Sequence, residues 1–220
     1  MWKACIFDLD GTLANTLDSM AVVMNAVLRS YDLKELPVDN YRYYCGEGAS
    51  VLVRRCLEAA GDSDLQYYEE AEKKYRRQFD EDPLFKVSHY PGMPETLRYL
   101  KEKGIPLGVC SNKPDIAAKK VVKEMFGTEL FLEVAGQSEQ IRRKPAPDGP
   151  LAIAKAFQVK PEECLYIGDT KTDMQTGKAA GMYTIGVLWG FRDKEELVNN
   201  GADIVIEHPE QLKDFFEERT

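Results

Sequence analysis

Two aspartates stand two residues apart near the start of the chain, in the segment Ile-Phe-Asp-Leu-Asp-Gly-Thr of residues 6–12. The apolar residues before them predict a buried strand that ends here, so the side chains of Asp8 and Asp10 leave the same face. Two carboxylates so placed repel each other and attract a hard cation, and Mg²⁺ fits best because it prefers oxygen ligands. The structural alternative is a strand that ends in an Asx turn, with Gly11 supplying the bend.

The rest of the chain alternates between strand and helix patterns, which is typical of a parallel sheet with crossover helices. In an open α/β sheet, ligands gather beyond the carboxyl ends of the strands. The Asp pair would therefore lie at the edge where ligands bind. The predicted strands are residues 3–9, 106–110, 131–135, 164–167 and 182–187, with a last one near residue 204.

The segment between the first and second predicted strands is different. It contains helical patterns near residues 16–31, 50–60 and 65–79 but no convincing strand. We therefore expect an α/β core of residues 1–15 and 84–220, interrupted by an all-helical domain of residues 16–83. Because this insertion leaves the core just beyond the Asp pair, we expect it to lie over the carboxyl edge of the sheet and to act as a lid.

Further polar residues follow the other predicted strands. Ser111 and Asn112 come directly after residues 106–110, Lys144 precedes a later helix, and Asp169 follows residues 164–167 with Asp173 four positions on. Singly, these residues have structural interpretations: Ser111 and Asp169 as helix caps, and Lys144 as a surface charge. If all the strands are parallel, however, every group reaches the same edge, and their joint placement favours a shared site.

The first two of these carboxylates suit phosphoryl transfer. A phosphomonoester needs a nucleophile in line with the leaving oxygen, a cation and donors for its other oxygens, and a proton for the leaving group. Asp8 can attack phosphorus and form an aspartyl-phosphate. Asp10 can protonate the leaving oxygen and then take a proton from the water that hydrolyses the intermediate.

The remaining groups complete this chemistry. Ser111 and Asn112 can donate to phosphate oxygens, and Lys144 can offset the charge of both the nucleophile and the phosphoryl group. Asp169 can complete the metal shell. Asp173, one helical turn on, either holds a metal-bound water or orients Lys144.

These segments resemble, in the same order, the four motifs of the haloacid dehalogenase superfamily. The resemblance covers the whole chain and implies a Rossmann-like, three-layer core with an inserted helical cap of type 1. It implies Mg²⁺ bound by Asp8, Asp169 and the backbone carbonyl of Asp10, and we include Asp173 among the candidate metal ligands. Within the first motif, Gly11 and Thr12 would contribute to phosphate binding. The motifs are DLDGT at residues 8–12, Ser111-Asn112, Lys144 before Pro145, and GDxxxD at residues 168–173.

Asp10 distinguishes this chain within the superfamily, because the dehalogenases need neither such an acid nor a metal. The chain looks like a phosphotransferase, and its segments at residues 46–48, 111–114 and 186–191 resemble those of phosphoglycolate phosphatases. Gly46 and Glu47 would then face the active site from the cap. We predict Mg²⁺-dependent hydrolysis of a small phosphomonoester, of the phosphoglycolate phosphatase type.

Other functions use the same groups. A phosphomutase similar to β-phosphoglucomutase would pass the phosphoryl group to a sugar hydroxyl, and a pyrophosphatase or nucleotidase would change only the leaving group. A non-catalytic phospho-sensing module is a different class. The presence of Asp10 argues against that module, because hydrolysis needs this acid, whereas a module that only carries a phosphorylated aspartate does not.

The composition of the chain indicates which class of partner and which cellular compartment to expect. The 29 lysines and arginines against 37 aspartates and glutamates give a net charge of −8, which argues against nucleic acid and against an anionic membrane surface. We expect a small phosphorylated metabolite as the partner, and a monomer or weak dimer. Five cysteines without metal-binding spacing indicate a reducing compartment. Together with the lack of a signal or membrane-spanning pattern, they predict a cytoplasmic protein.

Overall fold

A computed structural model describes residues 2–217 and divides the chain into two compact units. One unit holds the residues up to Asn15 together with those from His89 onward, and the other holds Thr16–Ser88. The return to the first unit lies five residues later than the sequence suggested. After α4 (Tyr68–Glu81), the chain continues in local turns, in which Asp82 N donates to Gln78 O and Val87 N donates to Leu84 O.

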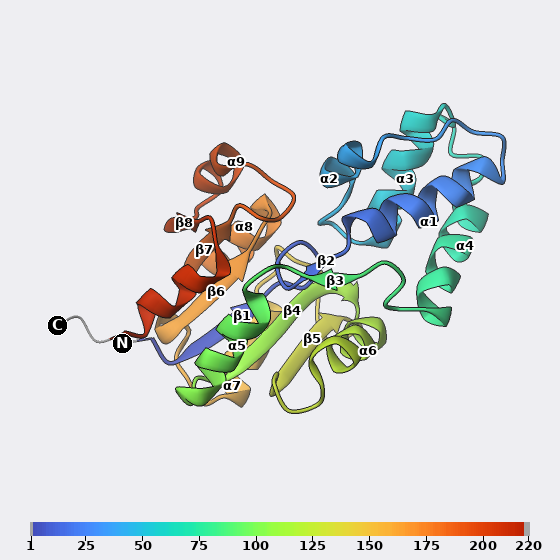
Figure 1. Ribbon diagram of the computed structural model, residues 1–220. Coiled ribbons are helices and arrows are strands. Elements are labelled where there is room, and N and C mark those ends of the chain that lie inside the picture. The colour runs from blue at the N-terminus through green and yellow to red at the C-terminus, as the bar shows by residue number, and fades with distance from the viewer. Residues whose placement is uncertain (1, 218–220) are drawn as a thin grey trace. The chain divides into compact units, whose positions relative to one another are not determined.

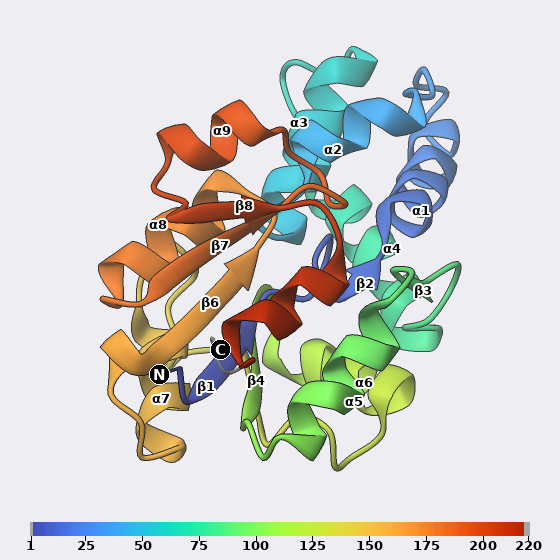
Figure 2. The ribbon, with the colours of Figure 1, turned by 60° about the vertical axis from the view of Figure 1, so that its left-hand side comes forward.

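The first unit is built on six parallel strands among the described residues, in the order β5-β4-β1-β6-β7-β8 (Figure 1). Figure 2 shows β1 between β4 and β6, and Phe7 is in register with Val109 and Ile167. Residue 8 therefore follows the central strand at the carboxyl edge. The α/β prediction is confirmed. The strands are β1 (Ala4–Phe7), β4 (Leu107–Pro114), β5 (Glu133–Gln137), β6 (Cys164–Gly168), β7 (Tyr183–Val187) and β8 (Ile204–Ile206).

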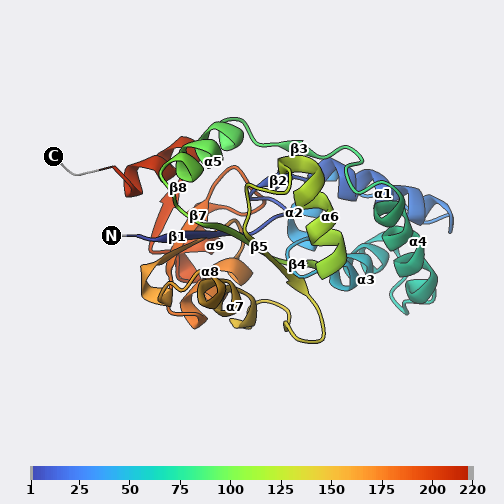
Figure 3. The same cartoon turned by 90° about the horizontal axis from the view of Figure 1, so that it is seen from below.

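Helices cover both faces of this sheet, which makes the three-layer arrangement (Figure 3). One side carries α5 and a late 3₁₀ helix, and the other carries α7 and α8. Strand β1 is buried on both faces, as its continuous apolar run predicts. Ile6 packs in the cluster with Tyr166 and Ile153, while the Phe7 ring meets Phe131 edge-on at 6.2 Å between centroids. The helices are α5 (Met93–Glu102), α6 (Asp115–Phe126), α7 (Asp148–Ala156), α8 (Lys171–Ala179) and α9 (Lys194–Asn199), with 3₁₀ helices at Pro161–Glu163 and Pro209–Phe215.

In the second unit, residues 16–87 are all described and their regular elements are helical. Fully buried Tyr41 anchors its core: the hydroxyl donates to Asn25 Oδ1 at 2.8 Å, and Asn25 also bonds Leu36 N and O at 2.9 Å each. A lid function for this unit stays a prediction. Its elements are α1 (Leu17–Arg29), a 3₁₀ turn at Val38–Asn40, α2 (Tyr41–Tyr44), α3 (Ala49–Ala60) and α4.

Two short strands, β2 (Ala14–Asn15) and β3 (Ser88–His89), pair where the chain passes between the units. Among residues 2–217, no helix combines the length and the apolar character that a bilayer crossing requires.

Helix α8 lies so close to the sheet that its glycine is a packing requirement. A Cβ at Gly177 would overlap the Thr184 methyl and stand 3.0 Å from the Tyr166 Cβ. In an open helix, Gly→Ala stabilises by about 1 kcal/mol, but here we expect Gly177→Ala to lower the free energy of unfolding by about 1–3 kcal/mol. Urea denaturation measures this sign. Ala179→Gly, at an exposed position of the same helix, is the control and should cost about 1 kcal/mol or less. A more stable Gly177→Ala protein would contradict the close packing.

Candidate active site

The chain turns sharply just after β1. Asp8 N still donates to Ile167 O at 2.8 Å, which extends the ladder with β6, and then Leu9 O accepts from the backbone N–H groups of Leu13 and Ala14. Gly11 has φ +95°, and a Cβ at this position would overlap the Asp169 carboxylate. Only glycine therefore lets this turn pass so close to the end of β6.

Lys144 joins two of the acidic side chains. Its Nζ donates to Asp8 Oδ1 at 2.7 Å, to Asp173 Oδ1 at 2.7 Å and to Cys110 O at 3.2 Å. An ammonium has three donors, so these bonds satisfy it completely. The Lys144 side chain is only 3% exposed, which makes this ion pair a buried one. Segments far apart in the chain thus meet at one charged atom.

The carboxylate of Asp173 is fixed from two sides. While Oδ1 accepts from Lys144, Oδ2 accepts from Thr170 N at 3.0 Å and Thr170 Oγ1 at 2.6 Å. Thr170 precedes the first residue of α8, so the bonds to it form part of a capping box. A Cβ at Gly168 would overlap Asp173, which shows how tightly β6 and α8 meet. The helix start therefore sets the position of the Lys144 partner.

Fully buried Asp169 is held by two loops. Thr12 Oγ1 donates to Oδ1 at 3.0 Å, and Phe191 N donates to Oδ2 at 2.8 Å. The indole Nε1 of Trp189 in turn donates to Thr12 O at 3.0 Å, which links the loop after β7 to the loop after β1. Sequence reasoning missed these loop contacts. The signal that could have found them is the position of Trp189 and Phe191 at the carboxyl end of β7.

Ser111 and Asn112, the predicted phosphate donors, both lie buried at the end of β4. Asn112 Oδ1 accepts from Lys144 N at 2.7 Å, and Asn112 Nδ2 donates to Lys144 O at 3.4 Å. Asn112 thus holds the backbone of the lysine whose ammonium reaches Asp8. Ser111 Oγ accepts from Lys113 N at 3.1 Å. The role of both residues in phosphate binding stays a prediction.

A second ion pair involves the other aspartate of the first motif. Lys113 Nζ donates to both carboxylate oxygens of Asp10, at 3.1 and 3.0 Å, and each side chain is 17% exposed. Sequence reasoning did not assign Lys113 to the site. Its position two residues beyond Ser111 on the same strand was the available signal, because alternate residues of a strand share a face.

Burial and charge crowding perturb the acidic groups. Burial raises the pKa of Asp8 well above its usual range, the nearby Asp173 adds to this, and Lys144 opposes it. Burial and Asp173 also raise the pKa of Asp169, to about 7. For Lys144, burial alone would lower the pKa, but Asp173 and Asp8 outweigh it, so the pKa is raised and the side chain stays charged. Of the three crowded carboxylates, Asp8 and Asp173 thus share one ammonium.

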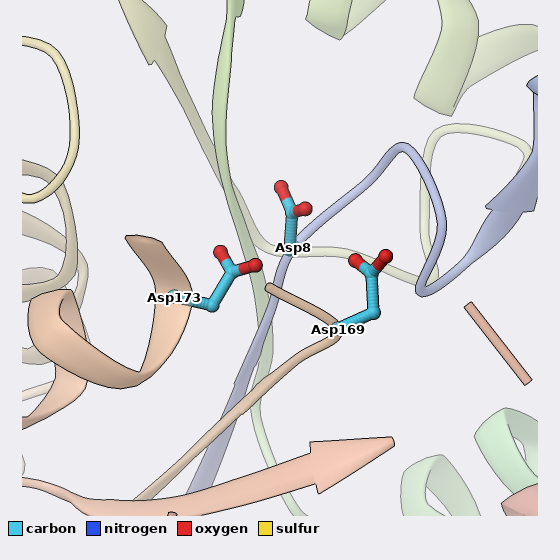
Figure 4. Close-up of side chains that lie close together, drawn as sticks. All are labelled: Asp8, Asp169 and Asp173. Atoms are coloured by element: carbon cyan, nitrogen blue, oxygen red, sulfur yellow. The ribbon is translucent and has the colours of Figure 1, made fainter. Parts of the chain in front are cut away.

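The donor set fits a hard divalent cation. Asp8, Asp169 and Asp173 are buried and each offers a carboxylate oxygen, and these atoms all lie within 4.8 Å of one another. Figure 4 shows the three side chains converging from the end of β1, the end of β6 and the start of α8. Oxygen ligands with excess negative charge are what Mg²⁺ and similar cations prefer. A metal here would relieve the repulsion that raises the carboxylate pKa values.

Two predicted residues belong to the helical unit. Gly46 has φ +103°, and Glu47 Oε1 pairs with Arg55 Nη2 at 2.6 Å. Their expected place beside the phosphate stays a prediction.

Comparison with known proteins agrees with this arrangement. The model of the haloacid dehalogenase-like hydrolase family matches residues 5–187. The chain belongs to this family. The predicted resemblance is thereby confirmed. The prediction that the protein is an enzyme, a phosphatase of the haloacid dehalogenase type, is confirmed as well.

Curated relatives match nearly the whole length of this chain. A phosphoglycolate phosphatase of Rhodospirillum rubrum is 33% identical over 98% of this chain and 91% of its own length. One from Haemophilus influenzae is 33% identical and covers 96% of both chains. Among solved structures, a protein of Lactobacillus delbrueckii subsp. bulgaricus is 28% identical and superposes with a TM-score of 0.90 over 99% of each chain.

The charge balance at Lys144 predicts strong coupling between this residue and Asp173. In metal-free protein, we expect Lys144→Met to cost about 3–5 kcal/mol of unfolding free energy, because it leaves buried carboxylates unpaired. Adding Asp173→Asn should relieve that repulsion, so the double variant loses less than the sum of the single changes, by about 1–3 kcal/mol. Denaturant unfolding of all four proteins gives this value. The surface pair Lys3 and Glu163 is the control and should couple by less than about 1 kcal/mol. Additive losses at Lys144 and Asp173 would contradict the shared ammonium.

Proposed function

We propose that this protein hydrolyses a small phosphomonoester in a Mg²⁺-dependent reaction, through an aspartyl-phosphate on Asp8. The observation that carries the proposal is the Asp8 carboxylate at the centre of the sheet edge, 2.7 Å from the Lys144 ammonium. A nucleophile with a fixed counter-charge is what attack on a phosphate dianion requires. Because the relatives are named phosphoglycolate phosphatases, 2-phosphoglycolate is the proposed substrate.

In the first step, an Asp8 oxygen forms a bond to phosphorus and the ester bond to the leaving oxygen breaks. The proton of the Asp10 carboxyl passes to that oxygen, so the leaving group departs as an alcohol. Lys144 holds Asp8 in place and offsets charge throughout. Ser111 and Asn112 are the proposed donors to the phosphoryl oxygens, together with Gly11 and Thr12.

In the second step, water attacks phosphorus and gives its proton to Asp10. The bond between phosphorus and Asp8 breaks, which releases phosphate and restores both carboxyl groups. Asp10 thus acts as an acid and then as a base. Its presence favours hydrolysis over a long-lived phosphoaspartate.

The proposed Mg²⁺ ligands are Asp8, Asp169 and the backbone carbonyl of Asp10, with Asp173 beside them. When bound, the ion supplies positive charge that stabilises the phosphoryl oxygens in the transition state. The support for this assignment is the buried carboxylate cluster, whose negative charge Lys144 only partly offsets.

Further proposals concern the helical unit, the partner, the cellular location and the oligomeric state. We propose that the helical unit acts as a cap that excludes water, with Gly46 and Glu47 facing the phosphate. The net charge of −8 supports a small metabolite rather than nucleic acid as the partner. All five cysteines are free and buried, which supports a reducing, cytoplasmic location. We propose a monomer or weak dimer.

Mg²⁺ should stabilise the folded protein without any substrate. At about 100 times its dissociation constant, we expect a gain of about 2.7 kcal/mol, because the ion binds only the folded cluster. Thermal unfolding with and without Mg²⁺ measures this gain, and EDTA should remove it. In Asp169→Asn, most of the shift should be lost, while the exposed control Glu95→Gln should keep it. An equal shift in Asp169→Asn would place the ion elsewhere.

Phosphate release from a panel of metabolite esters tests the reaction itself. We expect turnover of 2-phosphoglycolate that needs Mg²⁺, is abolished in Asp8→Asn, and falls about 10²- to 10⁴-fold in Asp10→Asn. Glu95→Gln serves again as the control. Normal turnover by Asp8→Asn would refute the proposal. Interconversion of a sugar bisphosphate faster than phosphate release would favour a phosphomutase instead.

A further inference from the structure

The ion pair between Lys113 and Asp10 has no part in the reaction as proposed above. Its ammonium donates to both oxygens of Asp10, at 3.1 and 3.0 Å. The same Asp10 carboxyl must turn an oxygen toward the ester oxygen when it acts as the acid. Binding of substrate therefore has to change this ion pair.

The backbone of Lys113 is firmly held, so any change must come from its side chain. Lys113 N donates to Ser111 Oγ at 3.1 Å. On the other side, the main chain of residues 113–115 lies against Gly136 of β5, where a Cβ would overlap the Asp115 backbone and stand 2.8 Å from Lys113 O. The flexible stem of Lys113 thus carries its ammonium from a fixed point beside the predicted phosphate donors.

The two lysines of the site differ in their surroundings. Lys144 is 3% exposed and its three donors are all bound to protein groups of the site. Lys113 is 17% exposed, and its ammonium pairs with a carboxylate that the reaction must redirect. Lys113 is therefore the cation that can meet a solvent-borne ligand at little cost in burial, whereas Lys144 is locked in its ion pairs.

We infer that Lys113 is a specificity-determining residue that recognises an anionic group on the leaving part of the substrate. Its ammonium passes from Asp10 to that group when substrate binds, and Asp10, as the carboxylic acid, then donates a hydrogen bond to the ester oxygen. The substrate class this selects is phosphate esters of 2-hydroxy acids. The inference rests on the proposed function and deepens it.

The position of the anionic group follows from the contact distances. When Asp10 bonds the ester oxygen, the Lys113 ammonium lies one hydrogen-bond length beyond the Asp10 carboxyl, which it contacts at 3.1 and 3.0 Å. A carboxylate attached directly to the carbon that carries the ester oxygen lies within this reach. A neutral leaving group offers the ammonium no equivalent partner.

The exchange also keeps the charges matched. A charge-assisted bond to Asp10 is replaced by one to the substrate carboxylate, so neither carboxylate nor ammonium is left unpaired. A substrate without the carboxylate must break the ion pair with no replacement. A site built around a charged group discriminates strongly against an analogue that lacks it. The chain's net charge of −8 makes such a local cation necessary for a substrate with three negative charges.

The test compares 2-phosphoglycolate with phosphoglycolamide, in which a neutral amide of nearly the same shape replaces the carboxylate. For wild type we expect kcat/KM to favour the carboxylate by roughly 100-fold. In Lys113→Met that ratio should collapse to about 5-fold or less, and Lys113→Arg should restore part of it because the charge returns. Lys119→Met, an exposed lysine on α6, is the control and should keep the wild-type ratio.

A purely positioning role for Lys113 predicts a different result. In that case Lys113→Met lowers kcat/KM for both substrates by the same factor and leaves the ratio near 100-fold, which overturns the inference while the proposed function stands. Melting temperatures equal to wild type show that the variants are folded.

A binding measurement tests the inference about Lys113 independently of the hydrolysis reaction. We would measure the dissociation constant of 3-phosphonopropanoate, which matches 2-phosphoglycolate but has a methylene in place of the ester oxygen, and that of its amide. Lys113→Met should weaken the carboxylate compound at least 10-fold and the amide hardly at all. If wild type hydrolyses neither ester, the proposed function fails and this binding result alone decides the inference. Equal weakening of both compounds would overturn it.

Discussion

Three crowded, buried carboxylates, two of which share one buried ammonium, are the constraint on which the rest of the structure depends. Asp8, Asp169 and Asp173 repel one another, and Lys144 balances only part of their charge. Like charges in a low-dielectric site are held together only where other bonds fix them. The architecture around the sheet edge supplies those bonds. The remaining negative charge would attract a cation, and a bound cation would in turn attract a phosphate ester.

Each acid is fixed by a different piece of the fold. The β1 ladder positions Asp8, the start of α8 holds Asp173, and two loops clamp Asp169. Close approach of these pieces demands glycine at the turns, since a Cβ at Gly11 or Gly190 would overlap Asp169. The candidate site is therefore made by backbone packing as much as by charged side chains.

Strand and helix periodicity were enough to predict the parallel sheet and the edge at which polar residues gather. Residues that directly follow a strand, such as Asp8 and Asp169, can be placed this way because strand ends in a parallel sheet coincide. Lys113 and Trp189 could have been placed at the same edge, but their contacts could not be predicted, because these depend on side-chain direction and loop conformation that only the folded chain sets. Asn112 shows the same limit: its position was predicted, but its bonds to the Lys144 backbone were not.

A helical insertion was expected at residues 16–83 because the pattern there lacks strands. Its second boundary lies five residues later in the structure, after a series of local turns at residues 82–87. Periodicity gives no information on such turns. The candidate chemistry at the sheet edge, by contrast, could be predicted from residue types, because charged residues that are buried together are found mainly at functional sites.

Chemical trapping of the intermediate tests the central claim most directly. Protein mixed with Mg²⁺ and 2-phosphoglycolate is quenched in the steady state and reduced with borohydride, which converts an acyl phosphate on aspartate to homoserine, and the peptides are then mapped by mass spectrometry. The account predicts homoserine at position 8, dependent on substrate. Reduction at another carboxylate, or none at position 8 while phosphate is being released, would contradict it.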